Sequence, residues 1–286
     1  FFIILFVFKT NASILDSVKT NKKRVAIVSG SLGLYFTASY LYVQNAWWGD
    51  ISEEFHFDQG SDLVYALNVD KAAHFFGGVY ASDLFSSSYR WAGIGETRSK
   101  WYGAAFGIGI QLAIEFKDAY APYWGFSKWD LGLGSAGALW PVLQNYYNPL
   151  KAVNFKFSYL KRSNIYWDLE AQRGKNPSKF SWFDDYPNQT YWMTLDLDKL
   201  ANNNSLPKWM DIAVGFGLDD TQYLSSGTKM GGNQELYIAL DYDTNQILKK
   251  WNTPLAKKIK FILKYYKLPA PTIQFFPKIN FFPFFM

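Results

Sequence analysis

The sequence predicts an α+β protein, in which an N-terminal helical bundle of about four helices is followed by an antiparallel strand-rich half. Long apolar segments rich in Gly, Ser and Ala fill the first half. Near residue 151 the pattern changes, and apolar and polar residues then alternate with a period of two. We divide the chain into a partial signal peptide (residues 1–12), a helical bundle (22–150) and a strand-rich region (151–286) that ends in a basic amphipathic helix.

The first residues, FFIILFVFKTNAS, form a short apolar run before small residues that are typical of a signal-peptidase site. We therefore expect export, with cleavage near Ala12. Aromatic residues make up 20% of the chain, as in envelope proteins that anchor Trp and Tyr at membrane interfaces. Cysteine is absent, which excludes disulfides, thiolate metal sites, a cysteine nucleophile and a lipid-modified cysteine.

Four segments of the first half are expected to be helical. The uncharged segment Val25–Trp48 is long enough to span a bilayer, but its small residues equally suit packing inside a bundle. The other three helices are expected at Lys71–Phe85, at Trp101–Asp118 and from Ser127 to about Tyr147. Ser127 is the expected N-cap of the fourth helix, with Asp130 close to a capping-box position, and Pro141 is expected to kink it.

Strands are expected where hydrophobicity alternates, in the segments NFKFSYL, TYWMTLDL, DIAVGFGL and ELYIALDYD. NNNS and SSGTKMGGN are interpreted as loops between strands. The segment Leu248–Lys267 predicts an amphipathic helix with Ile259, Ile262 and Tyr266 on one face. Its other face carries lysines, at positions 257, 260, 264 and 267. Such a helix can lie on an anionic membrane or on a solvated protein surface. The last segment, FFPKINFFPFFM, lacks the alternation of a terminal strand.

Polar residues inside the apolar helices carry the chemistry of the first half. Asp70 and His74 are four residues apart and share a helix face, and Gln111, Glu115 and Asp118 share a face of the third helix. If these faces converge, they enclose one polar site. The expected network contains Asp70, Lys71, His74, Glu115, Asp118, Ser127 and Asp130.

Three interpretations of this network remain open. In a purely structural network, Lys71 pairs with Glu115 or Asp130, and His74 bonds to a carbonyl. In a catalytic site, the candidates are His74, Glu115, Asp118 and Asp130. In a divalent metal site, the candidate ligands are His74, Glu115 and Asp118, because imidazole and carboxylates together can hold such an ion. A triad of Ser127, His74 and an aspartate has no G-x-S-x-G elbow to support it.

The motifs DKAAH, EFKD and GFSKWDLGLGSAG resemble the D-K-x-x-H, E-x-x-D and G-x-S-x-x-D pattern of the YfiM-like predicted periplasmic lipoproteins, a family of unknown function. NAWWGDISEEFHF and DDYPNQTYW are similar to motifs of its longer, envelope-protein members. A remoter likeness is to VanZ-like proteins. The resemblance implies an envelope-associated protein, and it implies that Asp70, Lys71, His74, Glu115, Asp118, Gly125, Ser127 and Asp130 are motif positions. The chain lacks the lipid-attachment cysteine of that family.

We therefore expect an exported cell-envelope protein in the periplasm or outer membrane, with a membrane surface as partner. Without a basic run of nucleic-acid type, nucleic acid is not an expected partner. The alternative is a metal-assisted hydrolase or transferase that acts on lipid or cell-wall material. A transporter or channel component ranks last, because one segment alone is free of charge over a spanning length. In DDYPNQTYW, Asp184, Asp185, Asn188 and Gln189 are interpreted as turn formers rather than ligands.

Overall fold

The computed structural model describes residues 20–46, 53–58, 60, 62–122, 124–173, 184–201 and 207–286. The expected signal peptide lies outside the described residues, as does the centre of the NAWWGDISEEFHF motif. The chain groups into two compact units. One contains the chain up to Asp62 and Gly77–Asn145, and the other contains Leu63–Phe76 and Tyr146–Met286. The helix α2 (Val69–Trp91) is continuous, so its first turns belong to the second unit and the remainder to the first.

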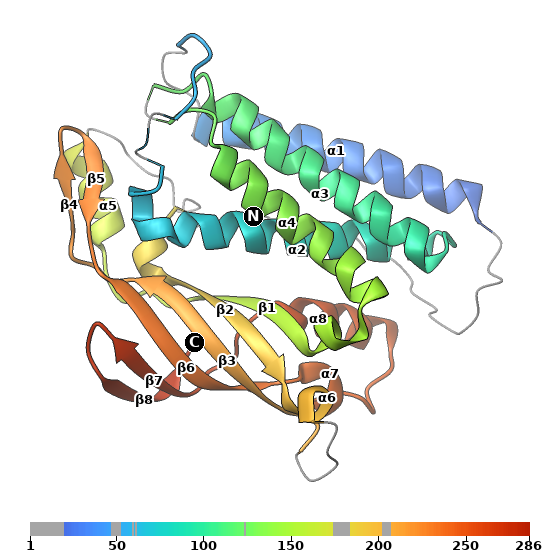
Figure 1. Ribbon diagram of the computed structural model, residues 1–286. Helices are drawn as coiled ribbons and strands as arrows, with labels where there is room; N and C mark the ends of the chain where they lie inside the picture. Colours follow the sequence, from blue (N-terminus) through green and yellow to red (C-terminus); the bar gives the residue numbers. More distant parts are fainter. Residues whose placement is uncertain are drawn as a thin grey trace. The chain divides into compact units, whose positions relative to one another are not determined.

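The α+β prediction is confirmed: helices fill the N-terminal half and an antiparallel sheet of six strands follows (Figure 1). The helical unit is built from α1 (Lys22–Ala46), α3 (Glu96–Asp118), α4 (Lys128–Tyr146) and α2 from Gly77 onward. Both α2 and α3 begin before their predicted starts. The Glu96 side chain provides an acidic group in the first turn of α3, where the helix dipole favours it.

Small residues set the spacing of α2, α3 and α4. A Cβ added at Gly78 would meet the Gly134 carbonyl oxygen and lie 2.7 Å from the Ala138 nitrogen. A Cβ added at Gly107 would lie 2.8 Å from the Ala138 Cβ atom. The three helices therefore approach closely at one level, as the Gly-rich sequence predicts.

Helix α1 packs on the same unit through few side chains. Val28 is fully buried in a cluster with Tyr89 and Ala92, whereas Leu34 is 72% exposed. Of the two settings that the sequence allowed for this segment, the described part of α1 lies against other helices. Among the described helices, none combines the length and the hydrophobicity that a membrane span requires.

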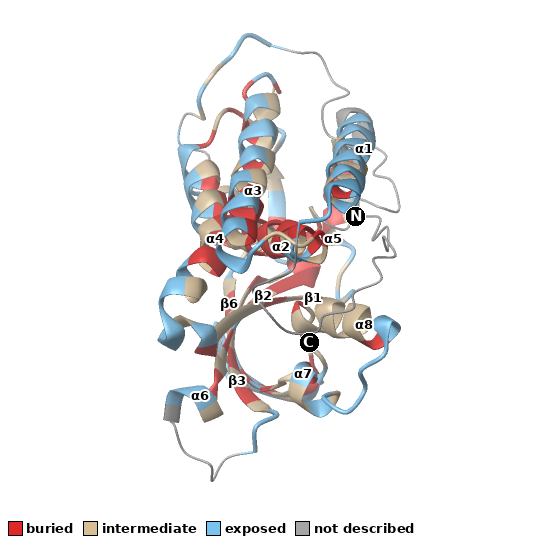
Figure 2. Ribbon diagram, turned by 90° about the vertical axis from the view of Figure 1, so that its right-hand side faces the viewer, coloured by how far each residue is buried: buried red, intermediate tan, exposed pale blue. Residues whose placement is uncertain are grey.

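The second unit contains the six-stranded sheet, in which neighbouring strands are all antiparallel and the order is β1-β2-β3-β6-β7-β8. The strands are β1 (Val153–Tyr159), β2 (Gln189–Asp196), β3 (Met210–Leu218), β6 (Gln234–Tyr242), β7 (Ala270–Phe276) and β8 (Asn280–Phe285). The predicted strands correspond to β1, β2, β3 and β6. The sheet curls (Figure 2), and the backbone of Phe157 in β1 exchanges hydrogen bonds with Tyr265 and Lys267, just before β7.

Two segments expected to be irregular form hairpins. SSGTKMGGN lies in a hairpin of β4 (Gln222–Ser225) and β5 (Thr228–Gly231). Ser226 and Gly227 both have positive φ, which a tight two-residue hairpin turn of the primed type needs. The C-terminal segment forms β8 although it contains Pro283. Because β8 is at the edge of the sheet, the missing N–H of a proline is tolerated there.

The second unit also contains short helices, before α2, before the sheet and between its strands. They are η1 (Tyr65–Asn68), η2 (Asn148–Ala152), α5 (Ile165–Gln172), η4 (Tyr186–Asn188), α6 (Leu197–Ala201), α7 (Thr244–Ile247) and α8 (Pro254–Lys264). Thr253 caps α8 by accepting a hydrogen bond from the Ala256 N–H at 3.1 Å. The predicted basic helix is therefore shorter than expected, and Lys267 is not on its outer face. Lys267 is fully buried, because the chain has already turned into the sheet.

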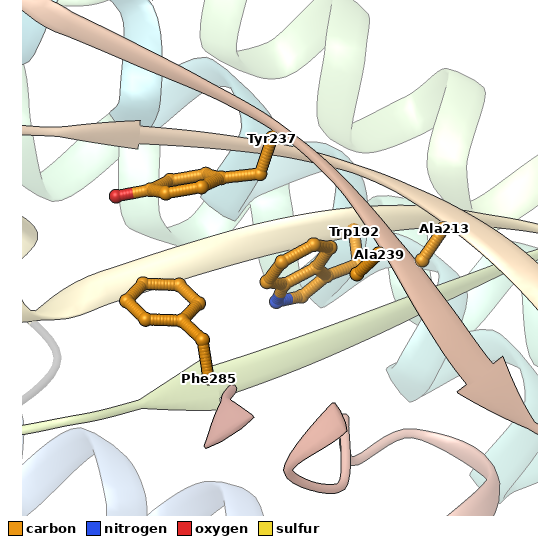
Figure 3. Close-up of a cluster of buried hydrophobic side chains, with 5 residues drawn as sticks. All are labelled: Trp192, Ala213, Tyr237, Ala239 and Phe285. Carbon is orange, nitrogen blue, oxygen red and sulfur yellow. The ribbon is translucent and has the colours of Figure 1, made fainter. Parts of the chain in front are cut away.

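The sheet buries its small and polar face. In β3, Asp211, Ala213, Gly215 and Gly217 are buried, whereas the apolar residues between them are only partly buried. The alternation predicted for this strand is confirmed. The buried face also carries an aromatic cluster, in which Tyr237 and Phe285 stack with ring centroids 4.7 Å apart and Trp192 lies beside them (Figure 3).

Candidate functional site

Ser127 is the centre of a hydrogen-bonded network in the helical unit. Its Oγ atom donates to Asp62 Oδ2 at 2.6 Å and accepts from the Asp130 N–H at 2.9 Å. The predicted N-cap is therefore confirmed. A capping box would have the third residue of the helix accept from the cap's N–H, but the Ser127 N–H donates instead to Glu115 Oε2 at 2.9 Å. A carboxylate of α3 thus takes the place that the sequence assigned to Asp130.

The loop before α4 is fixed by the segment before Asp62. Phe57 and Phe126 form a parallel β-bridge, and the Phe126 N–H donates to the His56 carbonyl at 2.9 Å. A Cβ added at Gly125 would lie 2.6 Å from the Asp58 nitrogen. The glycine of the motif GFSKWD is thereby explained, because a larger residue would push this loop away from the bridge that positions Ser127.

Three carboxylates surround Ser127 in this unit. A carboxylate oxygen of Asp130 lies within 4.8 Å of one of Glu115 and within 4.8 Å of one of Asp62. Glu115 is 1% exposed and Asp130 is 7% exposed. Like charges this close repel strongly where water is scarce, so cations, protons or hydrogen-bond donors must compensate them. The Ser127 hydroxyl and N–H supply two such donors.

Gln111 lies beside the small residues of α2 and α4. It is buried on α3, one turn before Glu115, and a Cβ added at Gly134 would lie 2.5 Å from its side chain. Gly77 faces the same Gln111 amide nitrogen, at 3.5 Å from an added Cβ. Asp118 ends α3 and is only partly buried. The sequence did predict that Gln111, Glu115 and Asp118 share one face of this helix.

The first turns of α2 hold Asp70, Lys71 and His74 in the second unit. Lys71 Nζ lies 2.9 Å from Asp70 Oδ2, and both side chains are buried. Burial, with a smaller contribution from the Asp70 carboxylate, raises the pKa of the Tyr191 hydroxyl. His74 is partly buried.

Two residues of the helical unit were missed as site residues by sequence reasoning. Asp62 lies in a polar stretch that reads as a loop, and no periodicity distinguishes it from its neighbours. His56 is the other histidine of the chain. Its side chain is partly buried, and both ring nitrogens are hydrogen-bonded. Hydrogen bonds from its ring to the carbonyls of Glu54 (3.0 Å) and Trp124 (2.9 Å) raise its pKa.

The DDYPNQTYW motif holds the chain after β1 in place. The Asn188 side-chain oxygen accepts from the N–H groups of Arg162 (2.6 Å) and Ser163 (2.9 Å), and its amide donates to the Ser163 carbonyl. Asp185 accepts from the Tyr159 hydroxyl at 2.8 Å. These contacts pair the buried side chains of Asp185 and Asn188 within the protein.

A second cluster of buried charges lies on the enclosed face of the sheet. Asp196, Asp211 and Asp241 are direct partners across β2, β3 and β6. Lys156 Nζ lies 2.6 Å from Asp241 Oδ2. Burial, with repulsion from Asp196 and Asp241, raises the pKa of Asp211 to about 7, and its Oδ1 atom has no hydrogen-bond partner among the described residues. The sequence contained a signal for the burial of Asp211, because this residue shares the face of β3 that carries Ala213, Gly215 and Gly217.

Residues 54–146 match the family model described as a predicted periplasmic lipoprotein (DUF2279). The expected family resemblance is thus confirmed for the segment that contains the DKAAH, EFKD and GFSKWD motifs. The chain has no match among curated proteins or solved structures.

Proposed function

We propose that this chain is an exported cell-envelope protein, whose helical unit is stabilised by a buried network of Ser127 and carboxylates, with His74 as a further candidate member from the sequence. The family that residues 54–146 match is described as a predicted periplasmic lipoprotein, which supports export and association with a membrane. The observation that carries the structural part is Ser127, which joins Asp62, Glu115 and the first turn of α4 through three hydrogen bonds.

The helix register supports a place for His74 in this network. Gly78, Gln111 and Gly134 lie at one level of α2, α3 and α4. Because α2 is one continuous helix, His74 precedes Gly78 by one turn on the same face. On this sequence pattern we propose that His74 joins the network, where an imidazole can compensate the crowded carboxylates.

Export and location are tested by fractionation of the producing cell and by N-terminal sequencing of the purified protein. We expect a periplasmic or outer-membrane fraction and a mature N-terminus near Ala12. Carbonate washing of the membrane fraction then separates peripheral from integral association. A cytoplasmic protein that still begins with the apolar run would contradict the proposal.

A second candidate function is a metal-assisted hydrolase or transferase of lipid or cell-wall material. It is favoured by the three crowded carboxylates at Ser127, because a histidine with two carboxylates is a ligand set that divalent ions accept. In this version the candidate ligands are His74, Glu115 and Asp118, and Asp130 is a further carboxylate close to Glu115. Asp118, which the sequence offered as a ligand, stands one turn further along α3, at its last residue. A bound divalent ion would lower the pKa of a water ligand and so supply a nucleophile.

Elemental analysis of the purified protein separates the two versions. The chain contains only two histidines, so His56→Gln is a matched control for His74→Gln. A metal site predicts about one divalent ion per chain in the wild type and in His56→Gln, and its loss in His74→Gln. The structural network predicts no stoichiometric metal in any of the three proteins and an unfolding midpoint that chelators do not change.

A further inference from the structure

We propose that the outward face of β6, β7 and β8 is a docking surface for a lipid membrane with anionic headgroups. This inference deepens the proposed envelope location and depends on it. It assigns the contact to a particular surface of the second unit, which the sequence did not single out. We call this surface the apolar sheet face and define it by Ile238, Leu240, Ile273, Phe275 and Phe281.

Apolar side chains on this face form a continuous row. Val214 of β3 is the direct partner of Ile238, Ile238 of Ile273, and Ile273 of Phe281. The row thus crosses four neighbouring strands in register. Ile238 is 49% exposed, Ile273 48% and Phe281 65%. A row of this length is a contiguous apolar patch rather than the scattered apolar residues of an ordinary surface.

The opposite face of the same strands is enclosed and carries both polar residues and the aromatic cluster that contains Tyr237 and Phe285. The charged residues of β6, β7 and β8 are Glu235 and Asp241, and both are buried on the enclosed side. Gln274 and Thr272 of β7 are buried there as well. An antiparallel sheet in water usually turns its apolar face to the core and its polar face to the solvent. Here the charged residues lie on the enclosed face and a row of exposed apolar residues lies on the outward face, which indicates an apolar environment outside the strands.

The positive charge of residues 244–286 favours an anionic membrane as the partner. Residues 244–286 contain no Asp or Glu and eight lysines, at positions 249, 250, 257, 258, 260, 264, 267 and 278. Only Lys267 of these is fully buried. Lys278 is exposed in the turn between β7 and β8, next to Ile279, which is 83% exposed. Lys278 thus stands at the end of the apolar sheet face, in a lysine-rich C-terminal segment, and this combination matches the acyl chains and the anionic headgroups of a bilayer. An apolar protein partner would not require this excess of positive charge.

Vesicle flotation of the full-length protein tests the proposal. The probes are vesicles of phosphatidylcholine alone and vesicles that also contain phosphatidylglycerol. We expect flotation with the anionic vesicles, weaker binding to the neutral ones, and a decrease as salt rises. The double variant Ile273→Gln/Phe281→Gln should bind anionic vesicles at least tenfold more weakly. Leu34→Gln, which changes an exposed apolar residue of α1, is the control and should bind like the wild type.

Both positions of the double variant are exposed, so we expect the variant to fold. Thermal unfolding of each variant checks that the fold is intact. Wild-type protein that fails to float with either vesicle would overturn the proposal. So would a folded double variant that binds like the wild type, or a wild type that forms dimers through this face without binding lipid. Cell fractionation tests the export proposal separately from the docking proposal. The double variant can lose vesicle binding and still be found in the periplasmic fraction.

Discussion

Ser127 donates a hydrogen bond of 2.6 Å to the Asp62 carboxylate, across 65 positions of the sequence. The same hydroxyl caps α4, and the same residue's N–H bonds to Glu115 of α3. One side chain thus joins an extended segment and two helices. These donors offset part of the cost of crowding carboxylates at this point.

Gly78 should be irreplaceable by alanine. Its added methyl group would meet the backbone of Gly134 and Ala138, which cannot move as a side chain can. We expect Gly78→Ala to destabilise the protein by about 3 kcal/mol, in the upper range for overpacking. Gly132→Ala is the matched control, because an added Cβ there meets nothing within 4 Å. That variant should be neutral or more stable by up to about 1 kcal/mol. Chemical denaturation of both proteins measures the difference, and equal stabilities would refute the close helix contact.

Asp211 should make the stability depend on pH. Its pKa in the folded protein is about 7, raised by burial and by the neighbouring Asp196 and Asp241, whereas an unfolded chain has a value of about 3.9. The folded state therefore binds the proton more tightly. The stability contribution is full below about pH 4 and is lost as the pH rises to about 7.

Asp211→Asn removes this titration. We expect the variant to be more stable than the wild type at pH 8, by about 1–4 kcal/mol, and to match it more closely at pH 4. Asp220→Asn, at an exposed position in the turn after β3, is the control. Urea unfolding at a series of pH values gives both curves. Parallel curves for the wild type and Asp211→Asn would show that this carboxyl is not perturbed.

Asn188 should be needed for stability rather than for a ligand. Its side chain bonds to the backbone of Arg162 and Ser163, so Asn188→Ala leaves buried backbone groups without partners. We expect a loss of about 2–4 kcal/mol, since each unsatisfied buried group costs about 1–3 kcal/mol. Asn245→Ala, at an exposed position of α7, should change stability by less than about 0.5 kcal/mol. An unfolding midpoint for Asn188→Ala that equals the wild type would support a ligand-binding role instead.

Much of the fold could be predicted from local patterns. The long helices and β1, β2, β3 and β6 follow from periodicity, and Ser127 from its capping position. The hairpin of β4 and β5 was missed because its strands are short and Ser226 adopts positive φ without being glycine. Strand β8 was missed because Pro283 is acceptable only at a sheet edge, and edge position is a property of topology rather than of sequence.

The sequence predicted the residues of the candidate site that lie on helices, Glu115 and Asp130. It did not predict Asp62, which lies in a loop. Glu115 and Asp130 stand out because acids are rare on Gly-rich apolar helix faces. Asp62 reaches Ser127 through the Phe57–Phe126 bridge, a long-range pairing that no local pattern encodes. The acids of the sheet show the same limit. Asp196, Asp211 and Asp241 become neighbours only through the strand register.

The central claim, that the helical unit depends on the network at Ser127, is tested most directly by the unfolding free energy of Ser127→Ala. We expect a loss of about 2–4 kcal/mol, from the missing helix cap and the lost hydrogen bond to Asp62. Ser135→Ala, at a partly buried position of the same helix, should change stability by less than about 0.5 kcal/mol. An unfolding free energy of Ser127→Ala within about 0.5 kcal/mol of the wild type would contradict the account.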